Sequence, residues 1–196
     1  MYTEQQKKRL SWMPWLYASL KPKLKVWVDE WQASIQAELM AMETISIGQR
    51  VFIAPDAAIF AEPNRDIIIG DDCTIAAGCF IHGPVVLAEH VSINHHSSLD
   101  GGQRGIRIGH HTRIAHDCSL YAFNHQTDKT RLIRQQPVHS QGITLGSDVW
   151  LGARVGVVDG IDIGDGAVVG MGSVVTHNVQ PGQKVAGVPA KAIGWR

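Results

Sequence analysis

Aliphatic residues recur at intervals of six along most of the chain. One run comprises Ile69, Ile75, Ile81, Leu87, Ile93 and Leu99, and a later run comprises Leu145, Leu151, Val157, Ile163, Val169 and Val175. A helix would show apolar spacing near 3.6, and an isolated half-buried strand would show strict alternation. Spacing by six instead predicts a coil of short, flat strands, each contributing one large inward side chain.

A second inward position lies four residues after each aliphatic residue, and its occupants are small or apolar. All three cysteines, Cys73, Cys79 and Cys118, fall at this position. A free thiol packs there as a small hydrophobe. We therefore expect the cysteines to fill the core, and neither to form disulfides nor to act as nucleophiles.

The repeat is interrupted three times. Four extra residues separate Ile59 from Ile69, three separate Leu99 from Ile108, and a long polar excursion occupies about residues 124–142. Regular coils support a fold, whereas irregular loops more often carry function. The long excursion is therefore where we expect the chemistry.

The first 44 residues depart from the repeat. Pro22 can open a helix, and after it Trp27, Trp31, Ile35, Leu39 and Met42 recur at helical spacing. We expect an amphipathic helix that packs on the coil or on a neighbour. An alternative is weak membrane-surface association through residues 7–20, where basic residues precede Trp12 and Trp15. The predicted division is thus a helical segment 1–44, a coil 45–190 and a tail 191–196.

Charge and hydropathy set limits on partners and location. The chain has 18 Lys and Arg against 18 Asp and Glu, which favours neither a nucleic acid nor a strongly acidic partner. It contains no apolar run long enough to span a bilayer and no signal-peptide pattern, so we expect a cytoplasmic protein.

Three later motifs carry a family resemblance. They are Ile143-Thr-Leu-Gly-Ser-Asp-Val-Trp-Leu-Gly152, the stretch 168–176, and Val185-Ala-Gly-Val-Pro-Ala190. With the hexapeptide repeat, they make the chain similar to the sugar O-acetyltransferases of the hexapeptide-repeat superfamily. The resemblance covers about residues 45–190. It implies a mostly β fold, a left-handed parallel β-helix, and a homotrimer with active sites between subunits.

The resemblance also implies roles for individual residues. His125, where the excursion begins, would be the general base, and the Ala153 N–H would help to hold the oxyanion. Asn94, Asp100, Asn124 and Trp150 would lie on the acceptor side. The acetyl-CoA site would be lined by Trp150, Ala153, Met171 and Thr176, with Lys184 and Lys191 near its phosphates. Histidine suits the base because its ordinary pKa lies near neutrality.

Ten histidines offer a competing interpretation. His90 and His95 are five residues apart, as are His111 and His116, and the two pairs fall at equivalent coil positions. The γ-class carbonic anhydrases share the coil and bind zinc through three histidines, the ligand number of catalytic zinc sites. That class needs neither the long excursion nor the later motifs, so we expect no metal.

The function expected from the resemblance is transfer of acetyl from acetyl-CoA to a hydroxyl of a sugar, nucleotide sugar or polysaccharide precursor. Serine, amino sugars and antibiotics remain alternative acceptors, because one scaffold hosts several activities. A non-catalytic scaffold is a further alternative, and it predicts no acetyl-CoA binding.

Overall fold

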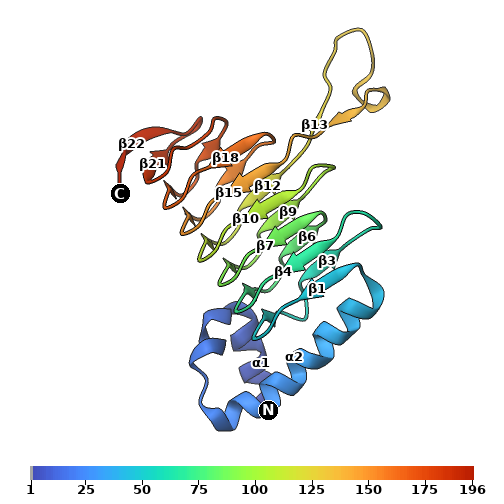
Figure 1. The fold of residues 1–196 in the computed structure, drawn as a ribbon, viewed down its shortest axis with the longest axis vertical. Coiled ribbons are helices and arrows are strands. Elements are labelled where there is room, and N and C mark those ends of the chain that lie inside the picture. The colour runs from blue at the N-terminus through green and yellow to red at the C-terminus, as the bar shows by residue number, and fades with distance from the viewer. Residues whose placement is uncertain (1) are drawn as a thin grey trace.

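Short parallel strands wind into a coil with three flat faces, and two helices close its lower end (Figure 1). The structure is a computed structural model that describes residues 2–196. The mostly β class and the coil predicted from the six-residue period are both confirmed.

Each face of the coil is one sheet of stacked strands, which are all parallel except for the last strand of the second face. The first face contains β1 (Ile45–Ile47), β4 (Ile67–Ile69), β7 (Val85–Leu87), β10 (Ile106–Ile108), β15 (Ile143–Leu145) and β18 (Ile161–Ile163). The second contains β2 (Phe52–Ile53), β5 (Thr74–Ile75), β8 (Ser92–Ile93), β11 (Arg113–Ile114), β16 (Trp150–Leu151), β19 (Val168–Val169), β21 (Gln183–Ala186) and β22 (Lys191–Trp195). The third contains β3 (Ala58–Phe60), β6 (Phe80–His82), β9 (Ser98–Asp100), β12 (Ser119–Tyr121), β17 (Gly156–Val157) and β20 (Val174–Val175).

The register between turns is the one that the repeat predicts. On the second face, for example, Ile75 pairs with Ile93 above it, and Ile114 pairs with Leu151. These side chains point inward, are fully buried, and belong to one continuous apolar core. Burial of stacked aliphatic residues is therefore the main force that holds the coil together.

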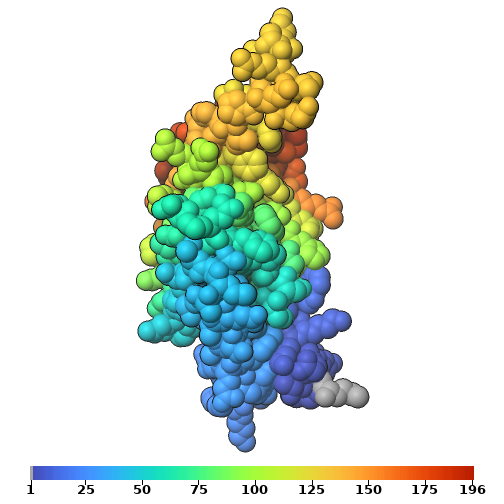
Figure 2. All heavy atoms as spheres, turned by 90° about the vertical axis from the view of Figure 1, so that its right-hand side faces the viewer, coloured from blue at the N-terminus to red at the C-terminus, as the bar shows by residue number. Residues whose placement is uncertain are grey.

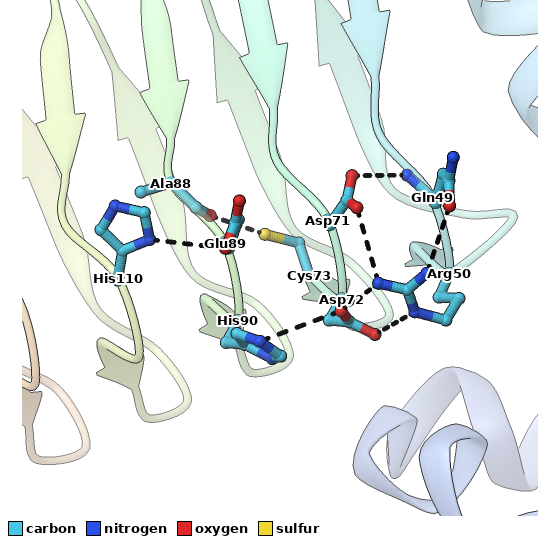
Figure 3. A network of polar contacts seen from close by, with 9 residues as sticks. All are labelled: Gln49, Arg50, Asp71, Asp72, Cys73, Ala88, Glu89, His90 and His110. Atoms are coloured by element: carbon cyan, nitrogen blue, oxygen red, sulfur yellow. Dashed lines mark hydrogen bonds and ion pairs between the residues drawn. The ribbon is translucent and has the colours of Figure 1, made fainter.

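The cysteines are core filler, as predicted. All three thiols are free and buried. The Cys73 thiol donates a hydrogen bond to the Ala88 carbonyl of the next turn at 3.0 Å (Figure 3). The Cys79 thiol does the same to the Asn94 carbonyl at 3.2 Å. Burial raises the pKa of Cys73 and of Cys79 to about 11, so neither thiol is a nucleophile near neutral pH.

We name the corners of the coil by the faces that they join. The 1–2 corner follows the first face, the 2–3 corner follows the second, and the 3–1 corner follows the third. All three interruptions of the repeat follow third-face residues, namely Ile59, Leu99 and Leu120, so every insertion lies at the 3–1 corner. The coil therefore presents its irregular backbone along a single edge.

The N-terminal segment is helical and covers the first turn of the coil. It consists of α1 (Tyr2–Trp12), a 3-10 helix η1 (Pro14–Ser19) and α2 (Pro22–Met42). Leu10, Tyr17 and Val28 form a small separate core with Phe52 of β2. The helix predicted after Pro22 is thus confirmed, although Met42 at its end is exposed.

The buried face of α2 contains a polar residue, Gln32, that is only 2% exposed. Its side-chain oxygen accepts the Ile53 N–H at 2.7 Å, and its amide donates to the Ile53 carbonyl at 3.0 Å. In the described part of the chain, β2 is the first strand of its sheet. The Gln32 side chain therefore supplies the hydrogen bonds that a preceding strand would make.

The helices are not membrane spans. Within residues 2–196, none combines the length and the hydropathy that crossing a bilayer requires.

Candidate active site

His125 lies at the start of the long excursion, on the 3–1 corner. The strand β13 (Asn124–His125) pairs antiparallel with β14 (Val138–His139), so His125 is opposite Val138 and Asn124 is opposite His139. The excursion projects beyond the coil as a narrow arm, gold in Figures 1 and 2. The His125 and Asn124 side chains are both exposed at its root, where an incoming molecule can reach them.

Two residues that the sequence analysis missed hold the root of the excursion in place. The Ser140 hydroxyl donates to the Ala122 carbonyl at 2.5 Å and accepts the Arg104 N–H at 3.0 Å. The buried Asp159 carboxylate accepts the Gln141 N–H at 2.8 Å and the Gly142 N–H at 2.9 Å. These contacts tie both ends of the excursion to regular turns of the coil, and so they orient His125.

The outer part of the excursion has its own internal structure. Gln136 is buried, donates to the Asp128 and Arg131 carbonyls at 3.0 Å, and accepts the Asp128 N–H at 2.8 Å. Leu132 and Ile133, in contrast, are 58% and 54% exposed.

Asp100 lies on the same corner, one turn below His125. It is in register with Tyr121 of β12 above and with His82 of β6 below. Its carboxylate is 3.3 Å from Nδ1 of His82 and 3.9 Å from the Arg65 guanidinium. The predicted acceptor-side carboxylate therefore already has two polar neighbours from its own chain, the His82 ring and the Arg65 guanidinium.

The other predicted site residues lie elsewhere on the coil. Asn94, Ala153 and Met171 are on the 2–3 corner, and the Ala153 carbonyl accepts the Gly172 N–H at 2.8 Å. Trp150 projects outward from the second face, 55% exposed, and Lys184 is in register with Val168 on that face.

Thr176 is on the 3–1 corner, above His125, and Lys191 begins β22. The full width of the third face thus separates His125, Asp100 and Thr176 from Asn94, Ala153 and Met171. One chain alone does not bring the two groups together.

The Ala153 N–H is suited to the role predicted for it. In the described part of the chain, no carbonyl or side chain accepts a hydrogen bond from it. A backbone donor left open on a rigid turn can stabilise an oxyanion at little cost in reorganisation.

The two histidine pairs occupy equivalent positions of the coil, as predicted. Their rings stack on one another between successive turns. The His90 and His111 rings lie 4.7 Å apart with planes at 10°, and the His95 and His116 rings lie 5.0 Å apart with planes at 7°. Rings stacked in this way present their faces, and not their nitrogens, to each other. Across residues 2–196, no group of three or more histidine, cysteine or acidic side chains is arranged to hold a metal ion.

Comparison with known proteins places the coil and the later motifs in context. A family model described as the hexapeptide repeat of succinyl-transferase matches residues 44–82 and 142–177. The galactoside O-acetyltransferase of Escherichia coli is 35% identical over 88 residues, which cover 45% of this chain and 43% of that protein. This chain therefore spans less than half the length of that relative.

Two further relatives match over more of their length. The putative lipopolysaccharide biosynthesis O-acetyl transferase WbbJ of Escherichia coli is 31% identical over 145 residues, covering 66% of this chain and 72% of that one. A solved structure of an AntD variant, an N-acyltransferase from Bacillus cereus, superposes with a TM-score of 0.72 and 27% identity. That match covers 82% of this chain and 89% of AntD, which is in complex with dTDP-4-amino-4,6-dideoxyglucose and coenzyme A.

Proposed function

Since the chain belongs to the hexapeptide-repeat acetyltransferase family, we propose that it transfers an acetyl group from acetyl-CoA to a hydroxyl of a sugar, nucleotide sugar or polysaccharide precursor. His125 is the general base. The observation that carries this proposal is the exposed imidazole at the clamped root of the excursion, in a chain that matches two O-acetyltransferases.

The reaction needs one proton acceptor and one oxyanion donor. His125 takes the proton of the acceptor hydroxyl while the oxygen attacks the thioester carbonyl carbon. The Ala153 N–H donates to the carbonyl oxygen as negative charge develops on it. Collapse of the tetrahedral intermediate expels the thiolate of coenzyme A, which takes the proton from His125, and no covalent bond to the enzyme forms.

The site is completed by a second copy of the chain. His125 and Ala153 border the third face on opposite sides, so they meet if three copies turn their third faces toward a common axis. The 3–1 corner of one copy then adjoins the 2–3 corner of the next. Cyclic symmetry of this kind produces three equivalent sites.

A glycine in the third face supports this packing. Gly156 is the first residue of the two-residue strand β17, and a Cβ placed there would meet only the Val174 methyl groups, at 3.8 and 4.0 Å. Its own chain therefore does not require glycine at this position. Glycine inside a strand often marks the close approach of another backbone, and the neighbouring Ser98 and Ser119 keep the face flat.

Acetyl transfer is tested by following release of the coenzyme A thiol with a panel of sugars, nucleotide sugars and amino sugars. We expect turnover on one acceptor class, and a loss of roughly a hundredfold or more in His125→Ala. His139→Ala is the matched control, because His139 is exposed on the opposite strand of the same hairpin. Turnover that survives in His125→Ala but falls in His139→Ala would move the base to the other strand.

The shared site is tested by mixing two inactive variants. Ala153→Pro removes the proposed oxyanion donor, and the equivalent position of the first turn is Pro55, so we expect the coil to accept proline there. Unfolding and reassembling Ala153→Pro with His125→Ala in equal amounts should restore roughly a quarter of wild-type turnover, since one interface in four combines two intact halves. No recovery from folded mixed trimers would show that each site lies within one chain.

An amino sugar is the second candidate acceptor, favoured by the similarity to AntD over 82% of the chain. A neutral amine attacks a thioester without prior loss of a proton. If an amino sugar is the substrate, we therefore expect His125→Ala to lower turnover far less than it would with a hydroxyl acceptor. The acceptor panel distinguishes a hydroxyl acceptor from an amino acceptor, because coenzyme A thiol is released only with the acceptor that the enzyme uses.

A further inference from the structure

A cavity of about 660 Å³ lies on the second face, between the N-terminal helices and the 1–2 corner. Small-molecule sites typically have volumes of about 300–1,000 Å³. None of the residues assigned to acetyl transfer lines this cavity. The trimer proposed above turns the third face inward, which leaves the second face open.

The floor of the cavity is a row of outward side chains on successive strands. Thr74, Ser92 and Arg113 are in register on β5, β8 and β11. The Thr74 hydroxyl oxygen is buried and has no hydrogen-bond partner in residues 2–196. A buried hydroxyl without a partner costs free energy, and this atom is enclosed, so a ligand would reach it only if the floor of the cavity moved.

One wall is a ladder of side chains from the same position in successive turns of the 1–2 corner. Arg50, Asp72, His90 and His111 all have positive φ there, which turns their side chains toward the cavity. Figure 3 shows the Arg50 guanidinium on the Asp72 carboxylate, at 2.6 Å, with His90 beside it. This wall is held in a fixed arrangement before any ligand binds.

The opposite wall is aromatic and comes from η1. Trp15 is 50% exposed and lines the cavity, while Tyr17 beside it is buried and donates a hydrogen bond to Asp29 at 2.8 Å. The Lys25 ammonium lies 5.2 Å from the centre of the Tyr17 ring. An exposed indole beside hydroxyl groups offers an apolar surface on which a sugar ring can stack.

The cavity lining carries more positively charged than negatively charged side chains. Lys25, Arg50 and Arg113 face two carboxylates, Asp72 and Asp148. Asp72 pairs with Arg50, and Asp148 pairs with Arg196 at 2.6 Å. Among the described residues, Arg113 has no carboxylate partner within ion-pair distance. Its guanidinium is therefore free to bind an anionic group bidentately.

We infer that this cavity binds an anionic saccharide, with the sugar ring on Trp15 and its phosphate or carboxylate on Arg113 and Lys25. The Ser92 hydroxyl would hydrogen-bond to the sugar from the floor. This inference does not rest on acetyl transfer, because the site involves neither His125 nor Ala153.

The test is calorimetric titration of the full chain with glucose 1-phosphate, glucuronic acid, glucose and inorganic phosphate. We expect at least one anionic sugar to bind about tenfold or more tightly than either glucose or phosphate alone. Binding should weaken when salt is raised from about 50 to 500 mM, because salt screens the charge contact. The two anionic sugars distinguish a phosphate ligand from a carboxylate ligand.

Variants locate the site. Arg113→Ala and Trp15→Ala should each weaken binding about tenfold or more, whereas Trp15→Phe should retain part of the affinity. Arg107→Ala is the matched control, since Arg107 is exposed on β10 of the first face, one strand earlier in the chain. Unchanged affinity in Arg113→Ala, loss of affinity in Arg107→Ala, or equal binding of glucose and glucose 1-phosphate would each overturn the inference.

Discussion

The hydrogen bonds of Gln32 allow a sharp prediction about how the helices hold the coil. Gln32→Leu keeps the side chain close to its volume but removes both bonds to Ile53, at 2.7 and 3.0 Å. The N–H and carbonyl of Ile53 then stay buried under α2 without partners. An orphaned buried group costs about 1–3 kcal/mol, and added apolar burial offsets about 1 kcal/mol. We therefore expect the free energy of unfolding to fall by about 3 kcal/mol.

Gln36 provides the matched control for this prediction. Its amide donates one bond, to the Val51 carbonyl at 2.8 Å, in a partly exposed place. Gln36→Leu should lower the free energy of unfolding by only about 1 kcal/mol, because water can hydrogen-bond to the Val51 carbonyl once the glutamine is gone. Urea unfolding followed by circular dichroism, at one fixed protein concentration, measures both variants. Equal losses in the two variants, or a loss below about 0.5 kcal/mol in Gln32→Leu, would refute the reasoning.

Three further predictions concern the third face, the core and the 1–2 corner. Gly156→Leu should leave the circular dichroism spectrum unchanged but give a monomer mass by light scattering, and a trimer mass would show that the third face is not the interface. Because burial raises the pKa of Cys73 and Cys79 to about 11, the folded protein should resist a thiol reagent at about pH 8 that reacts readily in urea; rapid modification of the folded chain would contradict this. The hydrogen bond from Arg50 lowers the pKa of Asp72, so the pair stabilises the fold above the unfolded-state pKa of about 4 and loses this effect as the pH falls. The stability difference between wild type and Arg50→Gln should accordingly shrink from pH 7 to about pH 3 in urea titrations, and a constant difference would exclude the pair as its cause.

The sequence alone predicted the coil because a single period controls it. Residues such as Ile75 and Ile93 face inward wherever the spacing of six holds. Since a slip of one residue would turn these side chains to the solvent, the register between neighbouring strands is fixed. Gln32 could not be predicted in this way, since a polar residue in an apolar helical stripe gives no sign of the strand edge that it completes. The helix α1 was also missed as a separate element, because its composition is mostly polar.

The candidate site was predicted in its residues but not in its geometry. Three six-residue repeats make one turn of the coil, and Ile59, Leu99 and Leu120 each belong to the third repeat of a turn. Grouping the repeats in this way predicts that every interruption lies at the same corner. The separation of His125 from Ala153 by a full face depends on how the strands stack, and that is a property of the whole coil. The clamping roles of Ser140 and Asp159 depend on contacts across 18 residues, which local patterns do not reveal.

The hairpin at the end of the chain has a consequence for polymerisation. A parallel coil ends in a row of unpaired backbone groups, onto which another copy could add and begin a fibre. Here β22 runs antiparallel along β21, with a shift of register between Lys184 and Val185. An incoming parallel turn would meet a strand of opposite polarity and irregular spacing, so its hydrogen bonds could not continue the ladder. The same short hairpin therefore covers the last turn of the second face and opposes end-to-end growth of that sheet.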